Sequence, residues 1–338
     1  STEIIEKKLK TYLGFESAFL GNSHIISQIR ESAEKIAQTK ATILIEGKTG
    51  TGKEVLARFI HANSSFSENS FVKVDCSTLP SSLMESLLFG HVKGAYTGAI
   101  STNKGLIEEA DNGTLFIDEA GNLTLETQAK LLQFLQDQTF IPVGASKPVK
   151  VNLRIIVASN IPLKELVKQG KFREDLYYRI AVVDFRLPEL KSRLEDLPVL
   201  INHILSELNN KHGRNITSLS PEAYTSMYNH SWPGNIRELK NVIERSYLFC
   251  TGTEISKVSI SQHTDTALET VNLITKGRKR SRFLDESVDD IVSAIKRNKG
   301  CMKDAAIEFN VTIPTIYNFL KRNGIEPNSL RKNPRKYS

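Results

Sequence analysis

The 338-residue sequence has few cysteines and no long apolar run. Its three cysteines, Cys76, Cys250 and Cys301, are odd in number and far apart, so neither a disulfide framework nor a cysteine-ligated metal site is indicated. No apolar stretch approaches the roughly 18 residues of a membrane span, and no signal peptide opens the sequence. We therefore expect a cytoplasmic protein with no membrane partner. Because the chain starts at Ser1 rather than Met, we also expect an upstream segment to be missing.

Basic residues are not balanced by acidic ones near the C-terminus. The whole sequence has a net charge of +7, but the residues from Thr275 onward contain 15 Lys and Arg against 7 Asp and Glu. The first 274 residues contain 30 against 31. A nearly neutral body with a basic end predicts a polyanionic partner for that end. The alternative is a tail whose charge only keeps the protein soluble.

Strand-like and helix-like segments alternate over the first half of the chain. Apolar runs predict five strands, at 42–46, 71–75, 114–118, 153–159 and 181–187. Helical patterns separate them, and this alternation favours an α/β domain with a parallel sheet. From about Pro188 to Gly252 the pattern is helical throughout. A polar stretch that contains residues 277–282 then reads as a linker before a last helical block.

A glycine-rich turn follows the first predicted strand. Its sequence GKTGTGK fits the pattern G-x-x-x-x-G-K, in which backbone N–H groups and a helix N-terminus hold phosphates. We therefore predict a nucleotide site in which Lys53 reaches the β- and γ-phosphates, rather than a glycine turn without a ligand. Glu54 stands where the general motif has Ser or Thr. The predicted nucleotide-binding residues are Gly47, Lys48, Thr49, Gly50, Thr51, Gly52, Lys53 and Glu54.

Two acidic residues end the third predicted strand. In the run TLFIDE, Asp118 is suited to organising Mg²⁺ and Glu119 to polarising an attacking water. Taken alone, such a pair is also typical of a solvated strand end. The phosphate-loop pattern upstream favours the functional interpretation, with ATP and Mg²⁺ as the cofactors.

The motifs GKTGTGKE (47–54), GAYTGA (94–99) and NGTLFIDEA (112–120) together resemble the central domain of the sigma-54-dependent transcription activators. These proteins, also called bacterial enhancer-binding proteins, are ring-forming AAA+ ATPases, and they ordinarily have Glu at the position of Glu54. The resemblance extends from Phe19 to the C-terminus. It implies an N-terminal lead-in, an AAA+ α/β ATPase subdomain with a parallel sheet, a helical lid, a linker and a Fis-type helix-turn-helix domain. We place these parts at 1–13, 14–187, 188–256, 257–282 and 283–338.

The resemblance also assigns four residues outside the phosphate loop. Asn160 corresponds to the first sensor, which reads the γ-phosphate, and Arg237 to the second sensor on the lid. Arg173 and Arg179 correspond to arginine fingers that reach the nucleotide of a neighbouring subunit. Simpler roles are a turn cap for Asn160, surface charges for Arg173 and Arg179, and an ion pair with Glu238 or Glu244 for Arg237.

The GAYTGA stretch corresponds to a loop that the family inserts into a helix between the second and third strands. In the family this loop contacts the sigma factor when ATP is bound. Its glycines permit a change of shape, and an exposed aromatic ring supplies compact apolar contact area. The alternative is a core-packed turn with Tyr96 buried. The implied sigma-54 contacts are Gly94, Ala95, Tyr96, Thr97, Gly98 and Ala99.

Three short helical patterns end the chain, with apolar residues on one face of each. The resemblance implies that the last two form a Fis-type helix-turn-helix, which this family uses to bind enhancer DNA as a dimer. The basic charge of this end agrees with that role. Residues outside the apolar face are the candidates for DNA contact. They are Thr315, Asn318, Lys321 and Arg322.

The resemblance implies an ATP-hydrolysing activator that binds enhancer DNA and remodels the sigma-54 RNA polymerase holoenzyme to permit open complex formation. It further implies a homo-oligomeric ring, a hexamer built from dimers, with an upstream regulatory domain or a partner protein. The sequence departs from the family at several positions. Lys48 replaces a common Glu, Asp75 an Asn, Leu87 and Val92 residues that are often acidic, and Tyr96 a Phe.

These departures keep a second hypothesis open, a nucleotide- and DNA-binding regulator of the same fold that acts independently of sigma-54. A third class, a chaperone-like unfoldase or a replication loader, would not need GAYTGA.

Overall fold

The computed structural model describes residues 19–77, 81–96, 98–258, 288–298, 302–309, 316, 319–321, 323 and 325. The chain divides into two compact units, 1–260 and 261–338, and each is described by itself. Within the described residues, no helix has the length and apolar character that a membrane span requires.

A five-stranded parallel sheet forms the centre of the first unit. Its strand order is β2-β3-β6-β1-β7, and every neighbouring pair runs parallel. The strands are β1 (Ile43–Glu46), β2 (Phe71–Asp75), β3 (Thr114–Asp118), β6 (Arg154–Ser159) and β7 (Val183–Arg186). Each lies within a predicted run, so the predicted parallel α/β sheet is confirmed. Strands β1 and β6 are buried along their whole length, which is why they read as continuous apolar runs.

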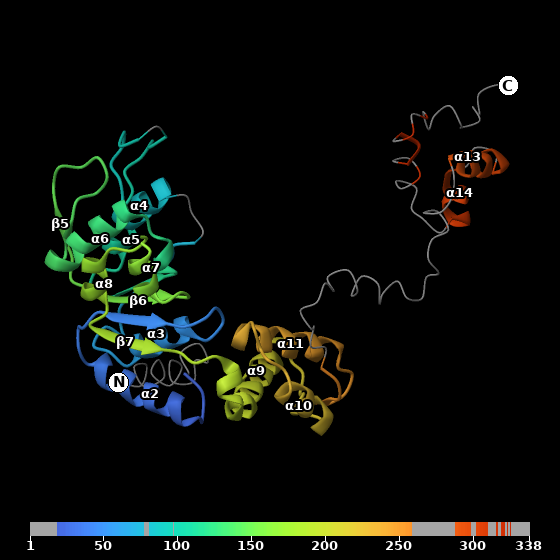
Figure 1. The fold of residues 1–338 in the computed structure, drawn as a ribbon, viewed down its shortest axis with the longest axis horizontal. Coiled ribbons are helices and arrows are strands. Elements are labelled where there is room, and N and C mark those ends of the chain that lie inside the picture. Colours follow the sequence, from blue (N-terminus) through green and yellow to red (C-terminus); the bar gives the residue numbers. More distant parts are fainter. Residues whose placement is uncertain are drawn as a thin grey trace. The chain divides into compact units, whose positions relative to one another are not determined.

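Helices cover both faces of this sheet (Figure 1). Alternate residues of a strand point to opposite faces, so Leu115 and Ile117 of β3 enter one core and Phe116 enters the other. Helices α2 (His24–Ala37) and α3 (Lys53–Ala62) cover the Phe116 face. The other face is covered by α4 (Ser81–Phe89), α5 (Leu106–Glu109), α6 (Leu125–Asp137), α7 (Leu163–Lys168) and α8 (Glu174–Ile180).

Short elements connect this framework. A 3₁₀ turn, η2 (Ala120–Asn122), follows β3, and Thr124 then caps α6 by accepting a hydrogen bond from the backbone N–H of Thr127 at 3.3 Å. After α6, β4 (Thr139–Phe140) and β5 (Val149–Lys150) form an antiparallel hairpin.

A helical lid follows the sheet. Two 3₁₀ turns, η3 (Leu190–Ser192) and η4 (Leu194–Asp196), lead into it. Its elements are α9 (Leu197–His212), β8 (Ser218–Leu219), α10 (Pro221–Tyr228), α11 (Asn235–Phe249) and β9 (Glu254–Ile255). The lid has its own core, centred on the fully buried Trp232 and Tyr247. It therefore packs as a body distinct from the sheet subdomain.

The second unit contains α13 (Val288–Arg297) and α14 (Met302–Glu308). The described apolar residues of its three predicted helical patterns pack into one small core. Ile291, Ala305 and Ile316 each contribute to it, one from each pattern. Residues 310–315, where the turn of the predicted helix-turn-helix falls, lie outside the described residues. The Fis-type assignment therefore stays a prediction.

Candidate functional site

The predicted phosphate loop joins β1 to α3 and lines a cleft of about 580 Å³ between the sheet subdomain and the lid. Gly50 and Gly52 have φ values of 80° and 105°, which side chains other than glycine rarely adopt. A Cβ atom at Gly50 would also collide with the backbone of Gly234 in the lid. Glycine is therefore required at Gly50 by both conformation and space.

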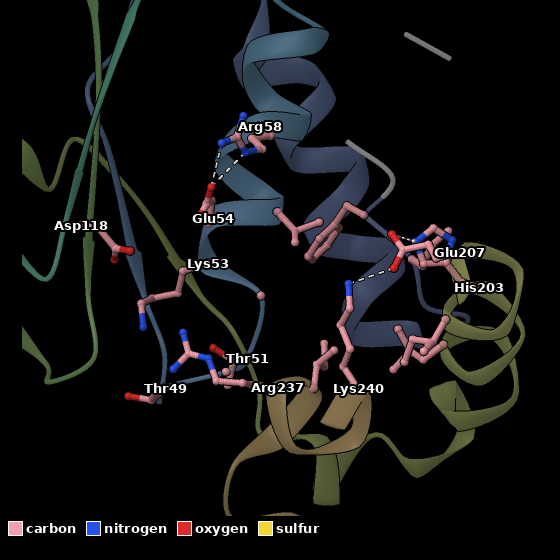
Figure 2. Close-up of a pocket in the computed structure, with 18 of the residues that line it drawn as sticks. Thr49, Thr51, Lys53, Glu54, Arg58, Asp118, His203, Glu207, Arg237 and Lys240 are labelled. Atoms are coloured by element: carbon pink, nitrogen blue, oxygen red, sulfur yellow. Dashed lines mark hydrogen bonds and ion pairs between the residues drawn. The ribbon is translucent and has the colours of Figure 1, made fainter. Parts of the chain in front are cut away.

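Helix α11 begins against this loop and carries Arg237 into the cleft. The backbone N–H of Ile236 donates to the carbonyl oxygen of Gly50 at 2.9 Å, and Asn235 Nδ2 donates to that of Thr49 at 3.0 Å. Figure 2 shows Arg237 beside Thr51, at the end of the cleft that also holds Lys53. The predicted second sensor and the phosphate loop therefore lie in one site, although they are far apart in the sequence.

Lys53 is the first residue of α3, and its side chain is only 7% exposed. Its Nζ donates to the carbonyl oxygen of Gly47 at 2.9 Å and lies 3.8 Å from Glu119 Oε1. Burial lowers the pKa of Lys53, and the neighbouring carboxylates of Glu119 and Asp118 oppose that change. A polyanion entering the cleft would act in the same direction as these carboxylates and favour the ammonium form.

The paired acids end β3 at the same cleft. Glu119 has a φ of 54°, and its backbone N–H donates to Asp118 Oδ1 at 3.0 Å. Its Oε2 accepts a hydrogen bond from the backbone N–H of Asn160 at 3.3 Å. Burial raises the pKa of Glu119, which makes its carboxylate a better proton acceptor than an exposed glutamate. A non-glycine residue with positive φ is often found where function fixes a side chain.

Asn160 follows β6, which neighbours β3 in the sheet. This adjacency brings the predicted first sensor next to Glu119. The alternative role of Arg237, an ion pair with Glu238 or Glu244, is not among the ion pairs of the described residues. Glu238 instead accepts from the backbone N–H of Gly234 at 2.9 Å, and Glu244 lies 3.8 Å from Lys211 Nζ.

Arg173 and Arg179 do not line the cleft of their own chain. Arg173 is 41% exposed and donates to both carboxylate oxygens of Asp175, at 3.1 and 2.8 Å. Arg179 is exposed, and its Nη2 donates to the carbonyl oxygen of Leu135 at 3.1 Å. Both arginines therefore lie at the surface, where a residue that acts on another subunit must be.

Lys73 is a residue of the site that the sequence analysis missed. It lies on β2, and its Nζ is 2.6 Å from Glu54 Oε2 and 3.4 Å from Asp118 Oδ2. Glu54 also accepts two hydrogen bonds from Arg58. Burial raises the pKa of Glu54, but the bonds from Lys73 and Arg58 outweigh it and leave that pKa below its usual value. The sequence feature that could have identified Lys73 is its position, since it is a charged residue at the centre of the apolar run FVKVD.

The end of the cleft opposite the phosphate loop is mostly apolar, and it too was missed. Lys240 Nζ lies 2.9 Å from Glu207 Oε2, and His203 Nε2 lies 3.6 Å from Glu207 Oε1 (Figure 2). Burial lowers the pKa of His203, and Glu207 opposes that change. The apolar lining there comes from Phe19, Leu20, Leu200 and Ile204, and Val55 and Ile236 continue it toward the phosphate loop. No motif marks these residues, because they come from four separate segments.

Three of the departures from the family pattern have local structural partners. Lys48 is 63% exposed and pairs with Glu189 at 2.8 Å, and neither Lys48 nor Gly47 lines the cleft. Asp75 accepts hydrogen bonds from the hydroxyl and the backbone N–H of Ser77, and these lower the pKa of Asp75. Leu87 is half-buried against the core.

The GAYTGA loop lies between α4 and α5, and so between β2 and β3, where the resemblance places it. At its base His91 exchanges two backbone hydrogen bonds with Asn103, at 3.0 and 2.9 Å. The ring of Tyr96 packs at 5.2 Å from that of His91 and remains 39% exposed, so Tyr96 is not buried in the core. Thr97 lies outside the described residues.

The hairpin of β4 and β5 supports the same loop. Val92 N–H donates to the carbonyl oxygen of Val143 at 3.1 Å, and a Cβ at Gly144 would lie 2.8 Å from that of Ala95. In Figure 1 the loop projects from the α4 end of the sheet subdomain, away from the lid.

Three of the four residues that are predicted to contact DNA lie outside the described part of the chain. Thr315, Asn318 and Arg322 are not among the described residues, and Lys321 is exposed.

Two family models match this chain, a sigma-54 interaction domain over residues 19–186 and an AAA+ ATPase lid domain over residues 191–272. The chain belongs to the sigma-54-dependent activator family. It is 39% identical to the regulatory protein AtoC of Escherichia coli over 91% of this chain and 68% of AtoC. It is 40% identical to the nitrogen fixation protein AnfA of Azotobacter vinelandii over 94% of this chain and 59% of AnfA.

A comparison with solved structures supports the same family assignment. The chain matches NtrX from Brucella abortus in complex with ADP with a TM-score of 0.68 and 31% identity, over 96% of this chain and 73% of NtrX. The predicted AAA+ P-loop fold with a helical lid is therefore confirmed. The chain spans 45% of the formate hydrogenlyase transcriptional activator of Salmonella typhimurium, and so about half the length of some of its relatives.

Proposed function

We propose that this protein is an ATP-hydrolysing transcriptional activator that acts on the sigma-54 RNA polymerase holoenzyme. The observation that carries the proposal is the convergence of Lys53, Asp118, Glu119 and Arg237 on one cleft beside the phosphate loop. Complexes of the related NtrX with ADP and with ATP support a nucleotide as the ligand.

In the proposed reaction the loop N–H groups and Lys53 bind the triphosphate. Glu119, ionised and held by Asn160 N–H, accepts a proton from the attacking water. Arg237 stabilises phosphate charge from the lid side. The carboxylate oxygens of Asp118 suit Mg²⁺, which prefers oxygen ligands and would neutralise charge on the phosphates.

The proposal includes a homo-oligomeric ring, a hexamer assembled from dimers. Arg173 and Arg179 support it, because they are exposed and do not line the cleft of their own chain. In a ring they would reach the neighbour's nucleotide. Specific ATPase activity that rises with protein concentration would support this assembly, and a fully active monomer would contradict it.

The GAYTGA loop is the proposed contact to sigma-54. An exposed Tyr96 on a loop between flexible glycines is suited to a transient apolar contact. The test is transcription from a sigma-54 promoter with purified holoenzyme, ATP and either the wild-type chain or Glu119→Gln. We expect open complexes only with the wild type. DNA binding without sigma-54-dependent transcription would favour the regulator that acts independently of sigma-54.

The C-terminal unit is the proposed enhancer-binding domain. The net positive charge from Thr275 onward and the exposed Lys321 support contact with DNA phosphates. Each lost phosphate contact should reduce the slope of log affinity against log salt by about 1. Lys321→Ala and Arg322→Ala should each do so, while Lys211→Ala in the lid should not. Salt-insensitive binding would place the DNA site elsewhere.

A further inference from the structure

A buried arginine and a buried aspartate lie where the chain passes from the sheet subdomain into the lid. Arg193 stands between η3 and η4, and Asp196 ends η4. Their side chains are 1% and 0% exposed, and Arg193 Nη1 lies 3.9 Å from Asp196 Oδ2. Charges are rarely buried so fully unless they are paired. The function proposed above gives neither residue a role.

Arg193 extends from this pair to the phosphate end of the cleft. Its Nη2 donates to the carbonyl oxygen of Thr51 at 2.9 Å, and its side chain lines the cleft. Its Nε–H is buried and has no hydrogen-bond partner among the described residues. Arg193 therefore contacts the phosphate loop directly through its guanidinium group.

Asp196 contacts the segment that follows the apolar end of the cleft in the sequence. Its Oδ1 accepts hydrogen bonds from the backbone N–H groups of Asn22 and Ser23, at 2.6 and 2.7 Å. Its Oδ2 accepts from the Ser23 hydroxyl at 2.9 Å. The residues just before this segment, Phe19 and Leu20, line the apolar end of the cleft.

Gly21 fits this arrangement closely. A Cβ at Gly21 would lie 2.9 Å from Asp196 Oδ2 and 2.7 Å from Ile26. A side chain at this position would therefore collide with both residues, so only glycine lets the segment pack this closely against the carboxylate. Arg30 holds the same segment from α2 by donating to the carbonyl oxygens of Phe19 and Gly21. The wall of the apolar end is therefore tied through Asp196 to Arg193, and through Arg193 to Thr51.

We propose that Arg193 and Asp196 are positioning residues that hold the two ends of the nucleotide cleft at a fixed separation. The inference rests on the proposed binding of ATP, with the triphosphate at the phosphate loop and the base at the apolar end. A ligand with two ends gains affinity from its second contact only when both subsites are held at the ligand's own span. The pair therefore affects the affinity for a ligand that occupies both ends of the cleft, and not the affinity for a ligand that occupies one end.

Inorganic triphosphate separates these effects, because it can occupy only the phosphate end. Loosening the connection should weaken ATP binding and leave triphosphate binding nearly unchanged. The readout is the ratio of the two dissociation constants. A loss of global stability does not change this ratio among molecules that remain folded.

Two variants test the pair. In Asp196→Asn the amide oxygen can still accept the N–H groups of Asn22 and Ser23, but the negative charge beside Arg193 is lost. In Arg193→Lys a cation remains near Asp196, but the planar group that reaches Thr51 is lost. The second variant keeps the buried charges balanced, so it decides the question if Asp196→Asn does not fold.

Arg154→Lys is the matched control. Arg154 is also fully buried and donates to two backbone carbonyls, those of Ile36 and Ala37. Its Nε has no hydrogen-bond partner among the described residues, and Arg154 does not line the cleft. Its replacement should cost stability in the same way without touching the connection between the two ends.

The measurement is isothermal titration calorimetry of each full chain with ATP and with inorganic triphosphate, beside a thermal melt. We expect Asp196→Asn and Arg193→Lys to weaken ATP binding by about tenfold or more and triphosphate binding by less than about threefold. Arg154→Lys should leave the ratio unchanged.

An unchanged ratio in folded Arg193→Lys would overturn the inference. Equal weakening of both ligands would also overturn it, because Arg193 would then act on the phosphate loop alone. A wild-type chain that binds neither ligand would instead refute the proposed nucleotide site itself.

Discussion

The nucleotide cleft and the GAYTGA loop belong to one compact unit but are built from opposite kinds of residue. The phosphate end of the cleft gathers charged side chains, and those of Lys53, Lys73, Glu54, Asp118 and Glu119 are linked by contacts of 2.6 to 3.8 Å. The loop contains no Asp, Glu, Lys or Arg from Gly94 to Asn103. Backbone pairing at its base and one ring contact hold it.

This difference agrees with the roles proposed for the two regions. Phosphate chemistry needs charges that are fixed before the ligand arrives, because preorganised groups need not rearrange during the reaction. A transient protein contact needs exposed apolar area on a backbone that can change shape. Damage to the loop should therefore leave ATP binding and hydrolysis intact, whereas damage to the cleft should also stop transcription, and the following variants test that one-way separation.

Lys53→Ala should have the largest effect. Lys53 is the buried cation at the phosphate loop, so its loss should abolish detectable nucleotide binding and with it ATPase activity and transcription. Calorimetry with ATP measures this directly. Lys48→Ala is the control, since Lys48 is exposed and does not line the cleft. Near-normal ATP affinity in Lys53→Ala would remove the loop from the binding site.

Arg179→Ala should lower the ATPase rate by about 10³ to 10⁵ if Arg179 acts as an arginine finger. ATP affinity should change little, because Arg179 does not line the cleft of its own chain. Mixing Arg179→Ala with Lys53→Ala should recover activity, since an intact cleft can then face an intact arginine. Lys171→Ala, a nearby exposed cation, serves as the control. No recovery on mixing would argue against action between subunits.

Glu119→Gln should retain ATP binding and lose about 10² to 10⁴ in turnover, the usual contribution of a general base. The wild type should also show an acid limb in kcat/KM. Glu119 must be ionised to accept a proton, and burial raises its pKa above the usual 4.5. Activity is thus lost as the pH falls through that raised value. A limb at or below pH 4.5, measured on folded protein, would assign the proton transfer to another group.

Sequence patterns alone predicted the parts of the candidate site that are contiguous in the chain. The phosphate loop and the pair Asp118–Glu119 are local motifs, and the apolar runs before them predict the strands that place them. The resemblance assigned Asn160 as the first sensor but did not place it beside Glu119. The sheet order gives the reason for that position, because β6 neighbours β3.

Contacts between distant segments were beyond sequence reasoning. Lys73 and Glu54 are 19 residues apart, and Asp196 and Ser23 are 173 apart. Lys73 and Glu54 meet because the fold brings β2 to α3 within the sheet subdomain, and Asp196 and Ser23 meet where the segment that leads into the lid contacts the residue before α2. A buried arginine such as Arg193 looks like any surface charge until its burial is known.

Substitution of Tyr96 should have a smaller effect, and that effect should be confined to the proposed contact with sigma-54. Tyr96→Ala should keep ATPase activity and lower sigma-54-dependent transcription by about 30-fold, the loss expected for an aromatic contact worth about 2 kcal/mol. Tyr96→Phe should be close to wild type, because the ring rather than the hydroxyl supplies contact area. Transcription and ATPase rates are measured on the same preparations. The melting temperature should change little, since Tyr96 is 39% exposed. A stability loss of about 3 to 5 kcal/mol would point to a core role instead.

Gly144→Ala should have the smallest effect on transcription, and its cause should be a single contact with the GAYTGA loop. Gly144 has a φ of 76°, and an added Cβ would lie 2.8 Å from the Cβ of Ala95 and 3.0 Å from its Cα. The β4–β5 hairpin would then have to move away from the GAYTGA loop. We expect a loss of about 1 to 2 kcal/mol in stability from the left-handed backbone. We also expect a severalfold loss of transcription per ATP hydrolysed.

Gly213→Ala separates the two parts of that prediction. Gly213 ends α9 with a φ of 64°, and an added Cβ there would meet nothing within 4 Å. Gly213→Ala should introduce a similar backbone strain, so the melting temperature of this variant should fall as in Gly144→Ala. Because Gly213 lies in the lid, transcription per ATP hydrolysed should stay at the wild-type level. If both variants lost transcription equally, the loss would reflect stability alone. The hairpin contact would then have no part in holding the loop for sigma-54.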